Sequence, residues 1–313
     1  MTAIRAWVAG ARIASLGLLA LTILSLGCRT EVTGPANNSE GPADWLAWRS
    51  KRHESIAGTN GWTTLIARHW LPEGLTTVGS HASNSVVLPK DRVPPVVGGF
   101  HRRGREVSFE AASGVEARVA GLRVRECVMK SDRGGDPTVV QVGEVSFVII
   151  ERGERLGLRV RDPQAPERTR FEGLRYLPYD PQWRVDGRFE PYSKPRSMRV
   201  ADVAGGTQEL MATGELVFSH SGVECRLVAI EESDAEEYFV MFRDSTNGRA
   251  TNAAGRFLYV PKLGANGLLT LDFNRAFNPP CGFTPYATCP LPPMENTLPF
   301  HVRAGELKPL SHP

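Results

Sequence analysis

The sequence lacks the charge excess, the clustered metal ligands and the catalytic signatures that identify several common classes of protein. Its 37 basic and 34 acidic residues nearly cancel over 313 residues, which argues against nucleic-acid binding through charge. The 7 histidines are scattered without metal-ligand spacing, so we expect no metal and no cofactor. The chain has no Gly-x-Ser-x-Gly elbow, no phosphate-binding loop and no dinucleotide fingerprint. No standard catalytic class is indicated, and whether the protein is an enzyme stays open.

Long apolar runs are also scarce, and the one marked run lies at the N-terminus. Arg5 and Arg12 precede or begin it, residues 13–26 form it, and Cys28 follows shortly after. The run is short for a membrane-spanning helix, and the order Leu-Ser-Leu-Gly-Cys resembles a bacterial lipoprotein signal. We therefore expect residues 1–28 to be a signal peptide, with Cys28 lipidated and the membrane as a partner. An ordinary signal peptide or an uncleaved anchor is the alternative.

Two residues near the cysteine refine this expectation. Ser25 stands where such signals usually have Leu, so the fit to the lipoprotein pattern is imperfect. Arg29 stands where an aspartate commonly retains lipoproteins in the inner membrane. A cell-envelope location at the outer membrane or the periplasmic face is therefore favoured over the inner membrane. Residues 29–43 are polar and rich in Gly, Pro and Asn, which predicts a flexible tether.

The remainder of the chain, residues 44–306, has the pattern of an all-β domain, with a short tail at 307–313. Asp44 can cap one short helix that runs to about Ala57, but long amphipathic helices that would alternate with strands are absent. Short apolar runs separated by Gly-rich turns predict an antiparallel sandwich or barrel-like body. The expected strands are 107–109, 115–119, 122–129, 138–142, 145–150, 156–160, 183–189, 197–203, 216–219, 223–230, 238–243, 257–260 and 268–273.

A faint internal repeat raises the prospect of two related halves, 80–165 and 180–306. Residues 143–147 and 214–218 both begin with a Gly-Glu turn and end on a Phe in the following strand. The alternative is that β-hairpins resemble one another. A Pro-rich crossing loop at 162–180 would separate the halves.

The C-terminal segment 271–306 contains so many prolines that neither helix nor regular sheet can form. Its polar residues nevertheless predict an ordered, irregular loop that lies across the β-rich body. Cys281 and Cys289 lie within it and are candidates for a disulfide in an oxidising envelope; free thiols or a metal site are the alternatives. Cys127 and Cys225 are either buried singly or paired across the two halves.

The stretch from about Trp45 to Glu306 resembles the bacterial and archaeal family known as domain of unknown function 1684. At Asn252 and Phe277 the sequence departs from the family's more usual Tyr, which weakens any role for a tyrosine acid at either position. The resemblance implies a family but no mechanism. It is carried by Gly61-Trp62, Gly79-Ser80, Arg152, Gly157–Asp162, Arg170-Phe171, Gly173, Asp244–Gly248, Thr251, Gly255–Leu258, Asp272–Cys281, Cys289–Pro293, Asn296 and Ala304–Glu306.

Polar residues that the fold pattern leaves unexplained form the candidate ligand-binding set. One interpretation is a structural network that satisfies the carbonyl groups of the irregular loop. The other is a pocket for a small polar or anionic ligand, or for an envelope partner. A hydrolase with Asp272 or Glu306 as acid or base is an alternative, and a purely structural envelope protein is another. The set comprises Arg159, Arg161, Arg170, Asp244, Thr246, Arg256, Asp272, Asn274, Arg275, Asn278 and Glu306.

Overall fold

The structure is a computed structural model that describes residues 40–231, 236–262 and 268–310. The expected signal, the expected lipidation site at Cys28 and most of the expected tether lie outside these ranges, and so does the end of the tail. Residues 34–313 form one unit by their internal contacts. Within the described ranges, no helix combines the length and the hydrophobicity needed to cross a membrane.

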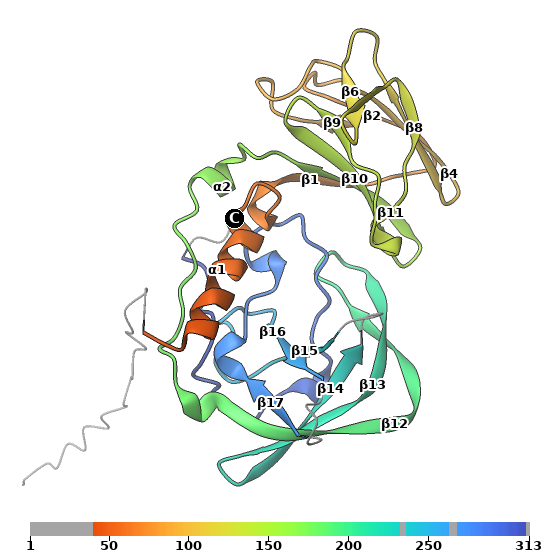
Figure 1. The fold of residues 1–313 in the computed structure, drawn as a ribbon. Helices are drawn as coiled ribbons and strands as arrows, with labels where there is room; N and C mark the ends of the chain where they lie inside the picture. The colour runs from red at the N-terminus through yellow and green to blue at the C-terminus, as the bar shows by residue number, and fades with distance from the viewer. Residues whose placement is uncertain (1–39, 232–235, 263–267, 311–313) are drawn as a thin grey trace, which may run out of the picture. The chain divides into compact units, whose positions relative to one another are not determined.

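The described chain is β-rich and antiparallel, as the sequence predicts (Figure 1). The N-terminal part forms two sheets, with strand orders β1-β11-β10-β9-β6-β7 and β3-β2-β4-β5-β8. Among the named strands of the described residues, only β2 and β3 pair in parallel. The strands are β1 (Leu65–Trp70), β2 (Gly74–Gly79), β3 (Val86–Val87), β4 (Gly98–Arg103), β5 (Glu106–Ala111), β6 (Ala117–Val119), β7 (Leu122–Val124), β8 (Glu126–Val128), β9 (Val140–Val142), β10 (Val145–Arg152) and β11 (Arg155–Arg161).

These two sheets enclose a hydrophobic core that follows from strand alternation. In β5 the side chains of Val107, Phe109 and Ala111 are buried while those between them are more exposed, which is the period of two expected for a strand with one buried face. Phe109 packs near Phe100, with ring centroids 5.0 Å apart. The residues of this core are therefore those that the period-two alternation of the strand directs to its buried face.

The C-terminal part forms a third sheet in the order β16-β15-β14-β13-β12-β17. Its two edge strands, β16 and β17, contact each other, so the sheet curves into a nearly closed, barrel-like form. Leu216, Phe242 and Leu271 are among the residues buried inside it. The strands are β12 (Arg184–Ala201), β13 (Thr207–His220), β14 (Val223–Glu231), β15 (Glu237–Phe242), β16 (Arg256–Pro261) and β17 (Leu269–Asp272).

The two hairpins of the faint repeat differ in their surroundings. Gly143 begins a turn, as expected, with a φ of +60°, but Gly214 lies inside β13 at an irregularity of register between Ala212 and Gly214. A Cβ at Gly214 would lie 2.4 Å from the carbonyl oxygen of Glu190, so Gly serves a close strand approach there and not a turn. Because one hairpin belongs to a two-sheet region and the other to a single curved sheet, the repeat does not extend beyond the hairpins.

The predicted helix is present as α1 (Ala43–Ala57), beside the C-terminal segment in Figure 1. Its N-cap is Pro42 and not Asp44, which instead occupies the first turn. There a carboxylate interacts favourably with the positive end of the helix dipole. The helix buries Trp45, Arg52 and Ile56. The crossing loop at 162–180 contains one short helix, α2 (Pro166–Thr169), and a 3₁₀ turn follows it at Pro181–Trp183.

The Pro-rich C-terminal segment is ordered and irregular, as the sequence predicts. Short 3₁₀ turns occur at Phe273–Arg275, Pro280–Gly282 and Met294–Asn296. The buried side chain of Asn296 accepts the Val228 N–H at 2.7 Å and donates to the carbonyl oxygens of Val228 at 3.1 Å and Met241 at 2.8 Å. One amide therefore fills a gap between β14 and β15 that the strands' own pairing leaves open.

Candidate functional site

Arg256 attaches the end of the Pro-rich segment to the curved sheet. It is fully buried, and its Nη2 donates to Asp244 Oδ2 at 2.5 Å and to the Val302 carbonyl at 3.0 Å. Its Nη1 donates to the Ala304 carbonyl at 2.5 Å. Burial lowers the pKa of Arg256, and the Asp244 carboxylate opposes that shift. This pair of predicted ligand-binding residues is thus occupied by the protein itself.

The turn around Asp244 supports this attachment. Asp244 Oδ1 accepts the Thr246 N–H at 2.6 Å, and the Thr246 hydroxyl bonds that of Thr251 at 2.7 Å. Gly248 has a φ of +78°, the left-handed position of the turn. Asp244–Gly248 is therefore a turn, and Thr246 has a structural role in it.

Glu306 and Asn278 form a second buried group together with Arg52 of α1. Arg52 donates from Nε to Glu306 Oε2 at 3.0 Å and from Nη2 to the Asn278 carbonyl at 2.7 Å. Asn278 Nδ2 donates to Glu306 Oε1 at 2.7 Å and to the Leu307 carbonyl at 2.8 Å. Burial raises the pKa of Glu306, while Arg52 and Asn278 oppose the shift. Arg52 is absent from the predicted set, although its place on the buried face of the helix could have indicated it.

Asp272, Asn274 and Arg275 form a third group, which fastens the start of α1 and the crossing loop. Asp272 Oδ1 accepts the Asn274 N–H at 3.1 Å, and Asn274 exchanges two hydrogen bonds with the backbone of Asp180. The Trp45 indole donates to the Asn274 carbonyl at 3.0 Å, and Arg275 pairs with Asp44 at 2.5 Å.

The two carboxylates named for a hydrolase therefore belong to separate groups. Asp272 is bonded within the third group and Glu306 within the second, and no described residue bonds both of them. General acid–base catalysis needs groups that reach one substrate. The hydrogen-bond geometry offers no support for a shared acid–base site.

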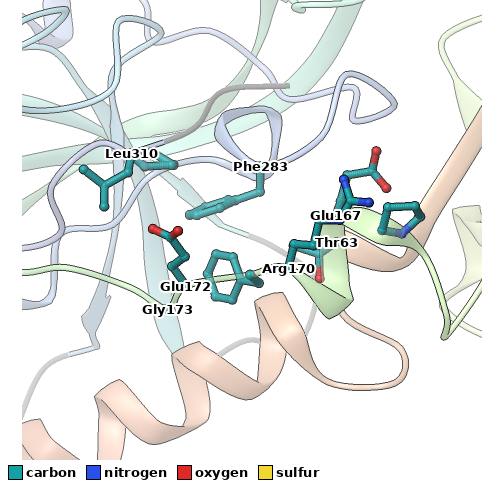
Figure 2. Close-up of a pocket in the computed structure, with 10 residues that line it drawn as sticks. Thr63, Glu167, Arg170, Glu172, Gly173, Phe283 and Leu310 are labelled. Carbon is teal, nitrogen blue, oxygen red and sulfur yellow. The ribbon is translucent and has the colours of Figure 1, made fainter.

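Arg170 lies in a different pocket, shown in Figure 2, with a volume of about 260 Å³. Figure 2 shows Phe283 and Leu310 on one side of this pocket and Arg170 near Glu167 and Thr63. Arg170 is exposed, so water satisfies its guanidinium. The predicted set is therefore not gathered in one place.

Arg159 in β11 differs from every other member of the predicted set. It is only 7% exposed, and its Nε and Nη2 find no hydrogen-bond partner among the described residues. No described carboxylate forms an ion pair with it, although its guanidinium carbon lies 5.2 Å from the centre of the Trp62 ring. Burial lowers the pKa of Arg159 to about 10. A buried guanidinium without partners is costly, so its position calls for an explanation.

Arg159 does not itself line the largest of the pockets described here, a wide cleft, but three residues near it do. Its neighbours Trp62, Arg152 and Cys289 all line this cleft, whose volume is about 1060 Å³. Residues that line it come from β10, β11, β12, β13, β15, β16 and the Pro-rich segment. They include Arg105, Arg133, Glu151, Glu154, Arg155, Arg199, Glu209, Phe239, Phe257, Pro280 and Thr288.

Each arginine that lines the cleft has a carboxylate partner. Glu151 pairs with two of them, Arg105 and Arg133. The others pair as Arg152 with Asp132 at 2.9 Å, Arg155 with Asp202 at 3.2 Å, and Arg199 with Glu209 at 3.4 Å. The charges of the arginines that line the cleft are thus balanced by carboxylates. Arg159, which lies near them, has no ion-pair partner among the described residues.

Two further arginines have only backbone or hydroxyl acceptors in the structure. Arg161 donates to the carbonyls of Asn60 at 2.9 Å and Gly61 at 2.8 Å, and Arg68 donates to the Ala287 carbonyl at 2.7 Å. Carbonyl acceptors satisfy hydrogen bonds but do not neutralise charge. Arg68, Arg159 and Arg161 thus form no ion pair with a described carboxylate, an arrangement that suits an anion.

The sequence does not predict the cleft as a whole, although it indicates some of the residues in and near it. Arg159 was named as a candidate, and the family resemblance includes Trp62 and Arg152. Arg155 and Thr288 were missed, because nothing in the local pattern distinguishes them from exposed strand and loop residues. Among the described residues, no group of three or more His, Cys, Asp or Glu side chains is placed to hold a metal ion.

The four described cysteines are free thiols in the structure, in place of the disulfide expected between Cys281 and Cys289. These two are nevertheless in contact, because the Cys281 N–H lies 3.2 Å from Cys289 Sγ. A hydrogen bond from the Cys289 thiol lowers the pKa of Cys281, and the same contact raises the pKa of Cys289. Cys127 and Cys225 form no link between the two parts of the chain.

Comparison with known proteins places the chain in a family. Residues 169–307 match the model of the family described as "Protein of unknown function (DUF1684)", and the chain belongs to that family. This match covers the C-terminal sheet and the Pro-rich segment. The earlier part of the resemblance, from Trp45 to residue 168, lies outside it.

One solved structure that is similar in sequence is an uncharacterized protein of Haloarcula marismortui, determined by solution NMR. It shares 32% identity, over 48% of this chain and 85% of that chain, with a TM-score of 0.40. No curated protein matches the chain.

Proposed function

We propose that this protein binds a small anionic ligand, a carboxylate or a phosphate, in the cleft next to Arg159. The observation that carries the proposal is the buried guanidinium, which has neither a hydrogen-bond partner on two of its nitrogens nor an ion-pair partner. A planar guanidinium binds carboxylate and phosphate oxygens through two parallel hydrogen bonds. An anion would supply both the missing acceptors and the missing negative charge.

The neighbouring groups suit such a ligand. Arg152 is held by Asp132 and by the Thr288 hydroxyl, at 3.0 Å from its Nε, so it stays in the wall without closing onto Arg159. Trp62 lies against Arg159 and gives the site an apolar side, where the lower local dielectric strengthens an ionic contact. These features support binding, and none of them indicates a chemical reaction.

The test is a thermal-unfolding titration of the full chain with acetate, succinate and inorganic phosphate, and with neutral glucose as a control at matched ionic strength. A ligand that binds the folded state stabilises it by about 2.7 kcal/mol at a concentration 100-fold above its dissociation constant. We expect the melting temperature to rise with at least one anion and not with glucose. A folded protein that responds to none of the anions would contradict the proposal.

Arg159→Met and Arg199→Met form a matched pair of variants. Arg199 is also part of the cleft, but it is exposed and already paired with Glu209. We expect Arg159→Met to lose the anion response and Arg199→Met to keep it. Equal responses in the two variants would place the ligand elsewhere, or show only a general salt effect.

Export and lipid anchoring at Cys28 form the second part of the proposal, and they rest on the sequence of residues 1–28 alone. Mass spectrometry of the N-terminal peptide from cells, with Cys28→Ser as the control, tests this part. We expect a lipid-modified cysteine as the first residue of the mature protein. Recovery of an unmodified peptide that begins at Met1 would refute it.

A further inference from the structure

Cys281 and Cys289 differ from the other described cysteines by their mutual contact, and Cys289 also lies at the cleft. The Cys281 N–H donates to Cys289 Sγ, with 3.2 Å between nitrogen and sulfur. Cys289 lines the cleft, with Pro280, Thr288 and Pro290 beside it. Cys281 is only partly buried. The pair is therefore both close enough to join and open to a small reagent.

The backbone around the pair is held on both sides. The Cys289 carbonyl accepts the Val203 N–H at 3.0 Å, and the Thr288 carbonyl accepts Gln208 Nε2 at 2.6 Å. On the other side, Pro280–Gly282 forms a 3₁₀ turn. Because a fixed backbone already keeps the two thiols in contact, little chain entropy is lost when they form a disulfide. The reduced form is therefore close to the geometry of the oxidised form.

We propose that Cys281 and Cys289 are a reversible dithiol–disulfide couple that exchanges with disulfides entering the cleft. The Cys281 thiolate attacks one sulfur of the incoming disulfide, forms a mixed disulfide and releases the first thiolate. Cys289 then loses its proton and attacks Cys281 Sγ, which closes the internal disulfide and releases the second thiolate. Two electrons pass from the cysteine pair to the reagent, which leaves as two thiols.

The assignment of roles follows from exposure. Cys281 is the more exposed of the two, and its contact with Cys289 lowers the pKa of Cys281, which favours the thiolate there. Cys289 is buried and holds its proton more tightly. Cys127 and Cys225 have no thiol partner, and burial raises the pKa of each. They serve as internal controls.

The test is incubation of the full chain with 2-hydroxyethyl disulfide, which carries no charge and so does not depend on the anion site. Thiols are then counted by alkylation and located by peptide mass spectrometry. We expect Cys281 and Cys289 to be lost together and to appear as one linked peptide, while Cys127 and Cys225 stay reduced. A wild-type chain that keeps both thiols under these conditions would overturn the proposal.

Two variants test the order of attack. Cys289→Ser should accumulate a mixed disulfide at Cys281, and Cys281→Ser should react at least tenfold more slowly. Equal rates would refute the assigned roles. If either variant fails to fold, the rate of iodoacetamide modification of each cysteine in the wild type replaces this test, and Cys281 is expected to react first; modification of Cys127 or Cys225 before it would refute the roles.

The redox proposal and the anion proposal can fail separately. Arg159→Met should lose the anion response and still exchange disulfides, because exchange begins at Cys281. Loss of exchange in Arg159→Met with a normal fold would show that Arg159 serves the thiols and not an anion. Exchange in a wild-type chain that binds no anion would refute only the proposed function.

Discussion

Two buried arginines, Arg256 and Arg159, show how differently the protein uses the same side chain. Arg256 is fully buried and makes three hydrogen bonds, one of them within an ion pair with Asp244. Arg159 is nearly as buried, but two of its nitrogens have no partner. The first explains why the Pro-rich segment is fixed. The second has no structural explanation among the described residues, and this is why we propose a ligand there.

The comparison also separates the two interpretations of the predicted polar set. Around Arg256, Glu306 and Asn274 most of the polar groups bond one another and the backbone, which is what an irregular buried loop requires, although Arg256 Nε and Asn278 Oδ1 have no partner among the described residues. Around Arg159 two nitrogens of one guanidinium lack a partner, and no described carboxylate pairs with it. The two arginines thus differ in how many of their partners belong to the chain.

The largest expected effect is that of Arg256→Met on stability. This change leaves Asp244 buried without its partner and removes two bonds to the segment, so the free energy of unfolding should fall by about 3 to 5 kcal/mol. Urea denaturation measures it. Arg199→Met, whose ion pair is exposed, is the control and should change stability by less than about 1 kcal/mol. Similar losses in both variants would refute the structural role assigned to Arg256.

Asn296→Ala should destabilise the chain by an intermediate amount. Without the amide, the buried Val228 N–H and Met241 carbonyl lose their partners, and each unsatisfied group costs about 1 to 3 kcal/mol. Hydrogen exchange at the Val228 amide should also become faster. An unchanged exchange rate would show that water or a backbone shift replaces the side chain.

Arg159→Met should stabilise the chain, whereas the two preceding substitutions destabilise it. Methionine fills a similar volume and removes donors that have no acceptor, so without ligand the free energy of unfolding should rise by about 1 kcal/mol. Urea denaturation of the ligand-free variant measures the change. A loss of stability as large as that of Arg256→Met would mean that Arg159 has a structural partner, and the anion site would then be unsupported.

The smallest expected effect is a pH dependence specific to Arg159. Its pKa is about 10 in the folded state, below the usual value for arginine, so the charged form destabilises the fold at every pH below 10. Above that pH the folded state loses its proton before the unfolded state does, and stability should rise. The stability gap between wild type and Arg159→Met should narrow by roughly 0.4 kcal/mol at pH 10. A gap that stays constant from pH 8 to 11 would contradict the shifted pKa.

The strands were largely predictable, because period-two burial and Gly-rich turns are local signals. β5 and β14 follow their apolar runs closely. By contrast β2 and β4 are absent from the expected strands, since their sequences GLTTVG and GGFHRR have little alternation. The position of Gly214 inside a strand was missed as well, because a Gly-Glu pair has the same composition in a turn and at a bulge.

The sequence by itself determined an antiparallel β-rich body, one N-terminal helix and a rigid Pro-rich segment, since strand alternation, helix periodicity and the proline ring act over a few neighbouring residues. Only the tertiary structure decided which polar groups are satisfied. Arg256 and Arg159 both lie in β-strands, yet one meets Asp244 and two carbonyls while the other meets an indole ring. Hydrogen bonds and charge pairing depend on groups far apart in the chain, so no local pattern distinguishes an arginine that has an ion-pair partner from one that has none.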